Sequence, residues 1–218
     1  MATMAPSSSF APELAAYLQS RVATWRVLLL VLLVSGAILA ASTPAPLAGY
    51  LTVPILAAVL VVQLRLWDDI ADRDWDRIHH PQRLLVNSSH IQAFRGLLVA
   101  SILLMAIVLL LRGPARGLLA YAVLVGLLAS LYHSPLGARL SRPLRVSLVL
   151  SKYALLVLVV AAGSLAGHAS WVALGLYGLL AAFEWRDDRE LRAAGSLTGA
   201  AAGWGLGAAI VLAVFLAG

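Results

Sequence analysis

An all-α bundle of about seven transmembrane helices is the fold class that this sequence predicts. Of its 218 residues 61% are hydrophobic and only 12% are charged, a balance that soluble domains do not have. The apolar residues lie in long runs separated by short polar segments, which is the pattern of a multi-pass membrane protein. The chain has no cysteine, which excludes disulfides, thiolate catalysis and cysteine-ligated metal sites.

Each predicted helix is an apolar run of about 13–20 residues, close to the number needed to cross a hydrocarbon core. Two of the runs, the fourth and the sixth, are short and need their flanks to span it. The seven runs cover residues 25–41, 50–66, 93–111, 118–131, 146–165, 171–183 and 197–216. We expect residues 1–20 to be a flexible or interfacial segment, and residues 21–218 to form one transmembrane domain.

The positive charges predict the orientation of the bundle. Only Arg112 and Arg116, of 16 Lys and Arg residues, lie in odd-numbered loops, which leaves 14 in the N-terminal segment and the even-numbered loops. Positive charge favours the cytoplasmic side, so the N-terminus should lie inside and the C-terminus outside. We expect an integral protein of the bacterial inner membrane. The net charge of +6 is then a topology signal, and we expect no nucleic-acid partner.

The most informative polar cluster follows the second predicted helix. Five of the ten acidic residues lie between Asp68 and Asp76. At about 100° per residue, four of them share an arc of about 100° on one helix face, while Asp74 falls on the opposite side. These four are Asp68, Asp69, Asp72 and Asp76.

Like charges at this spacing repel each other, and carboxylates at the end of a membrane helix are costly. A divalent cation would compensate both effects, and Mg²⁺ prefers oxygen ligands. The alternative is a solvated helix on which these aspartates pair with neighbouring arginines, Arg65, Arg73 and Arg77.

A second acidic cluster follows the sixth predicted helix on the same expected side of the membrane. Glu184, Asp187 and Asp188 share one helix face, by the same geometry. Here the alternative is a salt-bridged loop in which Asp187 or Asp188 pairs with Arg192. Between the two clusters lies a loop that begins at Tyr132.

That loop is expected to break the helix at Pro135 and Gly137, and basic residues follow it. Among them is Arg139. Farther along, Lys152 stands about two turns into the next helix, where it either extends to the membrane interface or points at a bound anion.

Together these clusters resemble the UbiA superfamily of intramembrane prenyltransferases. The family pattern Asn-Asp-x-x-Asp-x-x-x-Asp is matched by Asp68-Asp69-x-x-Asp72-x-x-x-Asp76, with Asp68 in place of the asparagine. A Pro-x-Arg element follows in the family and here at 81–83. The tyrosine loop and the second acidic motif come after the fourth and sixth helices, as in the family. Nine helices are usual there, so the chain resembles a short member, truncated at its C-terminal end.

The resemblance implies a UbiA-like fold and transfer of an isoprenyl group from an isoprenyl diphosphate, with Mg²⁺ held between the two acidic motifs. The hydrophobic acceptor, an aromatic compound or a lipid, would meet it in the membrane at the cytoplasmic side. By this resemblance the metal ligands are Asp68, Asp69, Asp72, Asp76, Glu184, Asp187 and Asp188. The diphosphate-binding residues are Arg73, Arg77, Arg83, Arg139 and Lys152. The catalytic residues are Asp72, Asp76, Tyr132 and Lys152.

Two other functions remain open. Asp68-Asp-Ile-Ala-Asp72 also fits the Asp-Asp-x-x-Asp pattern of terpene cyclases, in which no acceptor is needed. A protein of a different class, a metal-binding carrier or a non-catalytic membrane scaffold, could carry the same acidic residues. The predicted spans contain almost no ionisable group other than Lys152, which disfavours a carrier. The sequence predicts neither the acceptor nor the oligomeric state.

Overall fold

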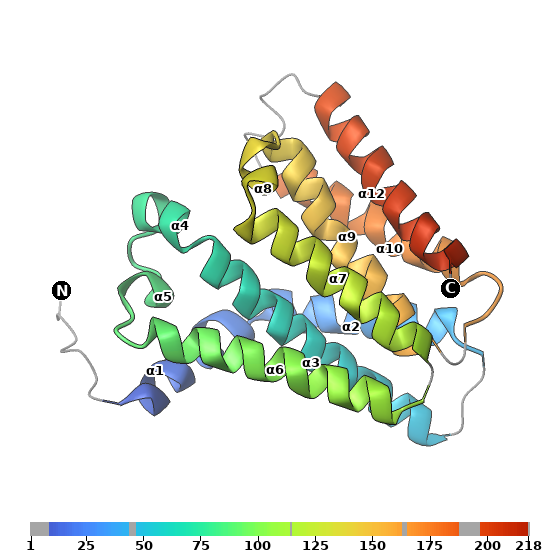
Figure 1. Cartoon of the computed structure of the whole chain (residues 1–218), viewed down its shortest axis with the longest axis horizontal. Coiled ribbons are helices and arrows are strands. Elements are labelled where there is room, and N and C mark those ends of the chain that lie inside the picture. The colour runs from blue at the N-terminus through green and yellow to red at the C-terminus, as the bar shows by residue number, and fades with distance from the viewer. Residues whose placement is uncertain (1–8, 44–46, 114, 163–164, 188–196, 218) are drawn as a thin grey trace. The chain divides into compact units, whose positions relative to one another are not determined.

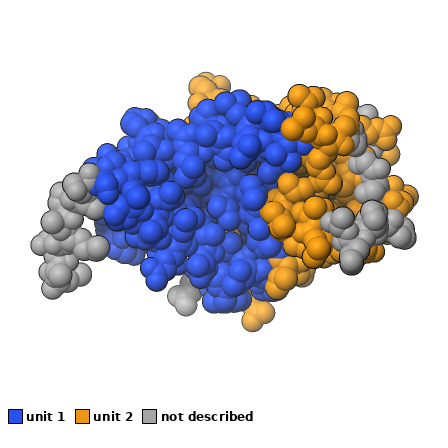
Figure 2. Space-filling model, turned by 90° about the horizontal axis from the view of Figure 1, so that it is seen from below, with its two compact units in different colours: residues 1–31, 58–108 blue, residues 32–57, 109–218 orange. Residues whose placement is uncertain are grey.

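The computed structural model describes residues 9–43, 47–113, 115–162, 165–187 and 197–217, and within these ranges the elements are helices (Figure 1). The chain divides into two compact units, which Figure 2 shows in different colours. Unit 1 comprises residues 1–31 and 58–108, and unit 2 comprises residues 32–57 and 109–218. Each unit is described below by itself.

Unit 2 is built around α9 (Arg142–Ala161), against which α7 (Ala115–His133), α10 (Ala169–Asp187) and α12 (Leu197–Ala217) pack. Every residue of α9 from Ser151 to Ala161 is buried. A helix that is apolar on all sides and surrounded by other helices becomes the core of its bundle. The close approach of α7 to α9 depends on Gly117, because a Cβ there would lie 3.0 Å from the Val159 carbonyl oxygen.

The turn after α7 forms where the sequence places helix-breaking residues. Helix α7 ends at His133, and the short α8 (Pro135–Arg139) follows it. A Cβ on Gly137 would lie 1.8 Å from the carbonyl oxygen of Leu131, so no other residue fits this turn without moving the backbone.

Unit 1 contains the second half of α3 (Leu47–Ala71), then α4 (Arg73–His79), α5 (Leu84–Asn87) and most of α6 (Ile91–Leu111). Helix α6 buries a narrow stripe that includes Phe94, Leu98 and Met105. Its other faces expose large apolar side chains, which in water would be unfavourable and in a membrane would meet lipid. These side chains are Leu97, Val99, Leu103, Leu104, Ile107, Leu110 and Leu111.

The N-terminal segment Phe10–Val22 also belongs to unit 1. It consists of α1 (Phe10–Tyr17) and a π-helical turn, η1 (Leu18–Val22). The next helix, α2 (Trp25–Ala41), is bent by 69° relative to this segment.

Four helices of the described chain are long and apolar enough to cross a membrane, and a fifth is added if the bent pair of the N-terminal segment and α2 counts as one span. The four are Tyr50–Ala71, Ile91–Leu111, Ala115–His133 and Pro143–Ala161. This architecture is all-α and compatible with a multi-pass membrane protein. Helices also form at the remaining predicted spans, in α10 and α12, but the count of seven membrane crossings stays a prediction, as does the UbiA-like fold.

Candidate functional site: a carboxylate and arginine cluster

The first acidic cluster occupies the end of α3 and the start of α4. Helix α3 ends at Ala71, and Asp72 stands at the break with φ −85° and ψ 3°. The Asp72 amide donates to the Asp68 carbonyl and the Asp76 amide donates to the Asp72 carbonyl, each at 2.8 Å. The helical hydrogen-bond pattern therefore continues across the break, and the spacing of the aspartates keeps its meaning.

Asp69 is buried, with only 6% of its surface exposed, and its carboxylate has several partners. Arg21 forms a two-pronged ion pair with it: Nη2 donates to Oδ1, and Nε donates to Oδ2 at 3.1 Å. The Tyr17 hydroxyl donates to Oδ2 at 3.0 Å, and Arg65 Nε lies 3.6 Å from the same oxygen. A buried carboxylate requires such partners to remain charged.

Asp76, two turns farther along, is 2% exposed and has a different partner. Arg83 Nη1 donates to both of its carboxylate oxygens, at 2.6 Å to Oδ2. Arg73 bonds to the backbone of α5, which directly follows Arg83. Its Nε and Nη2 donate to the carbonyl oxygens of Leu85 and Val86, at 2.9 and 3.2 Å. Arg73 therefore holds the chain that carries Arg83, which is a structural use of a predicted diphosphate-binding residue.

Asp69 and Asp76 line one small hollow of about 200 Å³, which is partly open to solvent. Because that volume includes open solvent, the enclosed part of the hollow is far too small for an isoprenoid chain. Seven residues line it: Tyr17, Arg21, Asp69, Asp76, Arg83, Leu84 and Leu85.

The remaining members of the first cluster lie toward solvent. Asp72 is exposed and Asp68 is half-buried, and both take part in further interactions. The side chain of Asp74 is 92% exposed and lies 3.5 Å from Arg77, itself well exposed. Such an exposed pair contributes little to stability.

Two partners of Asp69, Tyr17 and Arg21, come from the N-terminal segment, which is fixed at two further points. Phe10 and Tyr17 contact the ring of Phe94 edge-on, with ring centroids 5.0 and 5.6 Å apart. Glu13 accepts hydrogen bonds from Ser88 and Ser89 and lies 3.1 Å from His90 Nδ1.

These surroundings shift two pKa values. Burial, and then the neighbouring Asp69 carboxylate, raise the pKa of Tyr17 well above its ordinary value, so its hydroxyl remains a proton donor. The hydrogen bond from Ser88 lowers the pKa of Glu13, partly against the effect of burial, and His90 lowers it further.

Three predicted site residues between the acidic clusters lie in unit 2. Lys152 is 1% exposed within α9, with Nζ 5.1 Å above the ring of Tyr153. Tyr132 is half-buried, and Arg145 lies over its ring at 6.0 Å. Arg139 ends α8 and is exposed. Of these three, only Lys152 is deeply buried.

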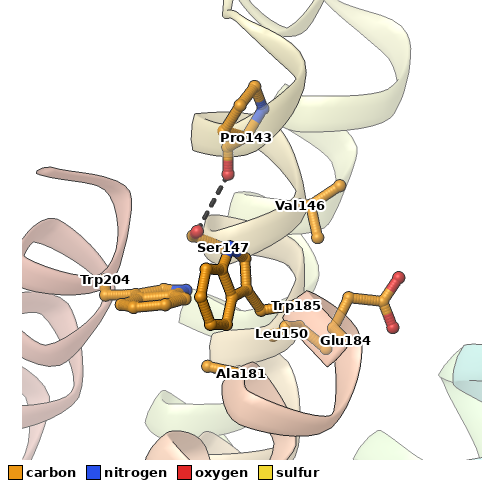
Figure 3. Close-up of a pocket in the computed structure, with 8 residues that line it drawn as sticks. All are labelled: Pro143, Val146, Ser147, Leu150, Ala181, Glu184, Trp185 and Trp204. Carbon is orange, nitrogen blue, oxygen red and sulfur yellow. Dashed lines mark hydrogen bonds between the residues drawn. The ribbon is translucent and has the colours of Figure 1, made fainter. Parts of the chain in front are cut away.

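The second acidic cluster lies at the C-terminal end of α10 in unit 2. Glu184 is exposed at the rim of a hollow of about 220 Å³ in which Trp185 and Trp204 meet edge to face at 6.4 Å. In Figure 3 the Glu184 carboxylate points away from these two rings. The Asp187 side chain and all of Asp188 lie outside the described residues. Of the second predicted set of ligands, Glu184 is therefore the one whose side chain the structure describes.

Donor chemistry and number decide whether the first cluster fits Mg²⁺. Within the described part of the chain, no three His, Asp or Glu side chains converge as a ready metal site. Mg²⁺ however usually takes one or two protein carboxylates and completes its shell with water and substrate phosphates. Asp69 and Asp76 supply oxygens of the right kind and number, but each carboxylate is already paired with an arginine, so a metal would have to displace that arginine.

The sequence did not predict Tyr17 and Arg21 as site residues. Their spacing of four residues places them on one side of a helix, and this stripe was a readable signal. The spacing does not reveal the partner, because Arg21 and Asp69 are 48 residues apart in sequence.

Comparisons with protein-family models, curated proteins and solved structures found no match to this chain.

Proposed function

We propose that this protein is a Mg²⁺-dependent prenyltransferase that moves an isoprenyl group from an isoprenyl diphosphate to a hydrophobic acceptor in the membrane. The observation that carries the proposal is the pairing of two buried carboxylates with two arginines around one small hollow beside apolar helices. The motif resemblance given above supplies the reaction type.

The residues of the hollow have complementary roles in this proposal. Asp69 and Asp76 would hold the metal, together with Asp68 and Asp72. Arg83 would donate to the diphosphate. Mg²⁺, when bound, supplies positive charge that stabilises the diphosphate as a leaving group. The side chains of the protein would bind and orient the diphosphate and neutralise part of its charge.

The transfer step needs no oxidant or further reactant. The bond between the allylic carbon and the diphosphate oxygen breaks, and its electron pair leaves with the diphosphate. An electron-rich atom of the acceptor forms the new bond to that carbon and then loses a proton. Exposed apolar side chains such as those of α6 would keep the isoprenyl chain and the acceptor in the lipid phase.

The experiment is turnover of purified, lipid-reconstituted protein with Mg²⁺ and a series of isoprenyl diphosphates, with and without membrane lipid extract. Asp69→Asn, Asp72→Asn and Asp76→Asn should each abolish release of diphosphate. Asp74→Asn is the matched control, because its side chain is 92% exposed and is not among the residues that line the hollow. Equal loss in Asp74→Asn, or full activity in all the other three variants, contradicts the proposal.

Two other functions give different results in the same assay. A terpene cyclase would release diphosphate and a hydrocarbon or alcohol without acceptor. A non-catalytic scaffold would release nothing with any substrate, and one observation favours it: both buried carboxylates are already neutralised by arginine.

A further inference from the structure

The turn between α7 and α9 concentrates positive charge at one end of unit 2. Arg139 ends α8 and is exposed, and Arg145 stands in the first turn of α9, half-buried over the ring of Tyr132 at 6.0 Å. The sequence places a third arginine, Arg142, between them, and it has no Asp or Glu from residue 77 to residue 183. The turn therefore carries a local excess of positive charge.

The fold brings these arginines close together. The Cα atoms of Arg139 and Arg142 are three residues apart and so at most about 11 Å from each other, and Arg145 follows one helical turn later. Glu184 borders the hollow beside Pro143 and Val146, which lie on other sides of α9 than Arg145. One carboxylate does not balance three arginines, so the charge at the turn favours an anionic partner.

The same end of unit 2 lies where a membrane surface is expected. The turn joins the end of one candidate span, Ala115–His133, to the start of another, Pro143–Ala161. Beside the first turn of α9, Trp185 and Trp204 meet edge to face (Figure 3). Tryptophan is enriched at the level of lipid headgroups in membrane proteins. Span length and tryptophan position thus agree in placing the arginines at the level of lipid phosphates.

We propose that the turn between α7 and α9 is a binding site for an anionic phospholipid, whose headgroup phosphate is held by Arg139 and Arg145. A guanidinium can donate two parallel hydrogen bonds to a phosphate, and basic pockets between membrane helices bind anionic headgroups. The ring of Tyr132 holds the Arg145 guanidinium in place. The inference goes beyond the proposed function, because this lipid is not a reactant and Arg139 serves its phosphate in place of the substrate diphosphate.

The test measures binding of phosphatidylglycerol to delipidated full-length protein in a neutral detergent, followed by native mass spectrometry over a lipid titration. Arg139→Gln and Arg145→Gln should each weaken binding about fivefold, and the double variant about 25-fold. Arg145→Lys keeps the charge and should retain most of the affinity. Zwitterionic phosphatidylcholine should bind weakly, and equally to the wild type and the variants.

Arg116→Gln is the matched control, because Arg116 is an exposed arginine in the first turn of α7, at the opposite end of that helix. It should leave the affinity for phosphatidylglycerol unchanged. An equal loss in Arg116→Gln would indicate attraction by net charge alone and would overturn the inference. Wild-type affinity in the double variant would overturn it as well.

Inorganic diphosphate distinguishes a lipid site from a site for free phosphate groups. At the same concentration as the lipid, it should not displace phosphatidylglycerol, because it lacks the acyl chains that lie along the apolar helices. Displacement at that concentration would assign both arginines to soluble diphosphate and overturn the lipid site.

Discussion

The ends of α3 and α10 carry the same local pattern in the sequence, an apolar helix followed by carboxylates and arginines, yet their surroundings differ. At the end of α3, two other parts of the chain pair with the buried carboxylates: Arg21 of the N-terminal segment with Asp69, and Arg83 with Asp76. At the end of α10, Glu184 is exposed. The difference shows that buried carboxylates here depend on partners that arrive from distant or later chain segments, and not on the local pattern.

The largest effect should come from removing one partner of a buried pair. Arg83→Gln leaves Asp76 buried and without its counter-ion, and should lower the free energy of unfolding by about 3 kcal/mol. Arg77→Gln is the matched change on the same helix, and its exposed pair with Asp74 should cost less than about 0.5 kcal/mol. Chemical unfolding in detergent, followed by tryptophan fluorescence, measures both. Equal losses would show that burial does not distinguish the two pairs.

A smaller, local effect should follow acidification. Glu13 has a lowered pKa in the folded protein, so its contribution to docking the N-terminal segment is present above the ordinary value of 4.5 and is lost as the pH falls through the lowered value. The chain has no cysteine, so a nitroxide on Ser20→Cys reports the mobility of the segment alone. We expect mobility to rise in acid.

Adding Glu13→Gln should remove that dependence on pH and leave the segment equally mobile throughout. A label that remains immobile at pH values far below 4.5 would show that the aromatic contacts to Phe94 suffice without Glu13.

The smallest effect should be that of Glu184→Gln on stability. Because this carboxylate is exposed, its change should stay within about 0.5 kcal/mol in the same unfolding assay. A loss close to that of Arg83→Gln would mean that Glu184 is held as firmly as Asp76, and the contrast between the two helix ends would no longer stand. If the protein is a prenyltransferase as proposed, Glu184→Gln should also lower turnover, which is measured separately.

The sequence predicted helices where hydrophobicity alone decides them. Long apolar runs gave α3, α6, α7 and α9, and Pro135 and Gly137 gave the turn after α7. The apolar runs alone do not determine the number of membrane crossings. Helix α2 has only 17 residues and lies at an angle of 69° to the segment before it, so the two can count as one span.

The candidate site was predicted in part, for a physical reason. Helical spacing placed the aspartates, since it depends on local geometry alone. It could not show which of them are buried, because burial of Asp69 depends on Tyr17 and Arg21, about 50 residues earlier. Nor could it assign Arg73 to the carbonyls of Leu85 and Val86, because a guanidinium can donate to backbone oxygen as well as to phosphate.

The π-helical turn at Leu18–Val22 has a consequence for how this protein can change in evolution. Such a turn bonds five residues back where an α-helix bonds four, so it stores one extra residue in the segment. Deleting one residue from it would restore an α-helical turn and change the spacing between Glu13 and Arg21. Related chains should therefore vary in amino acid at Leu18, Gln19 and Ser20 but keep their number.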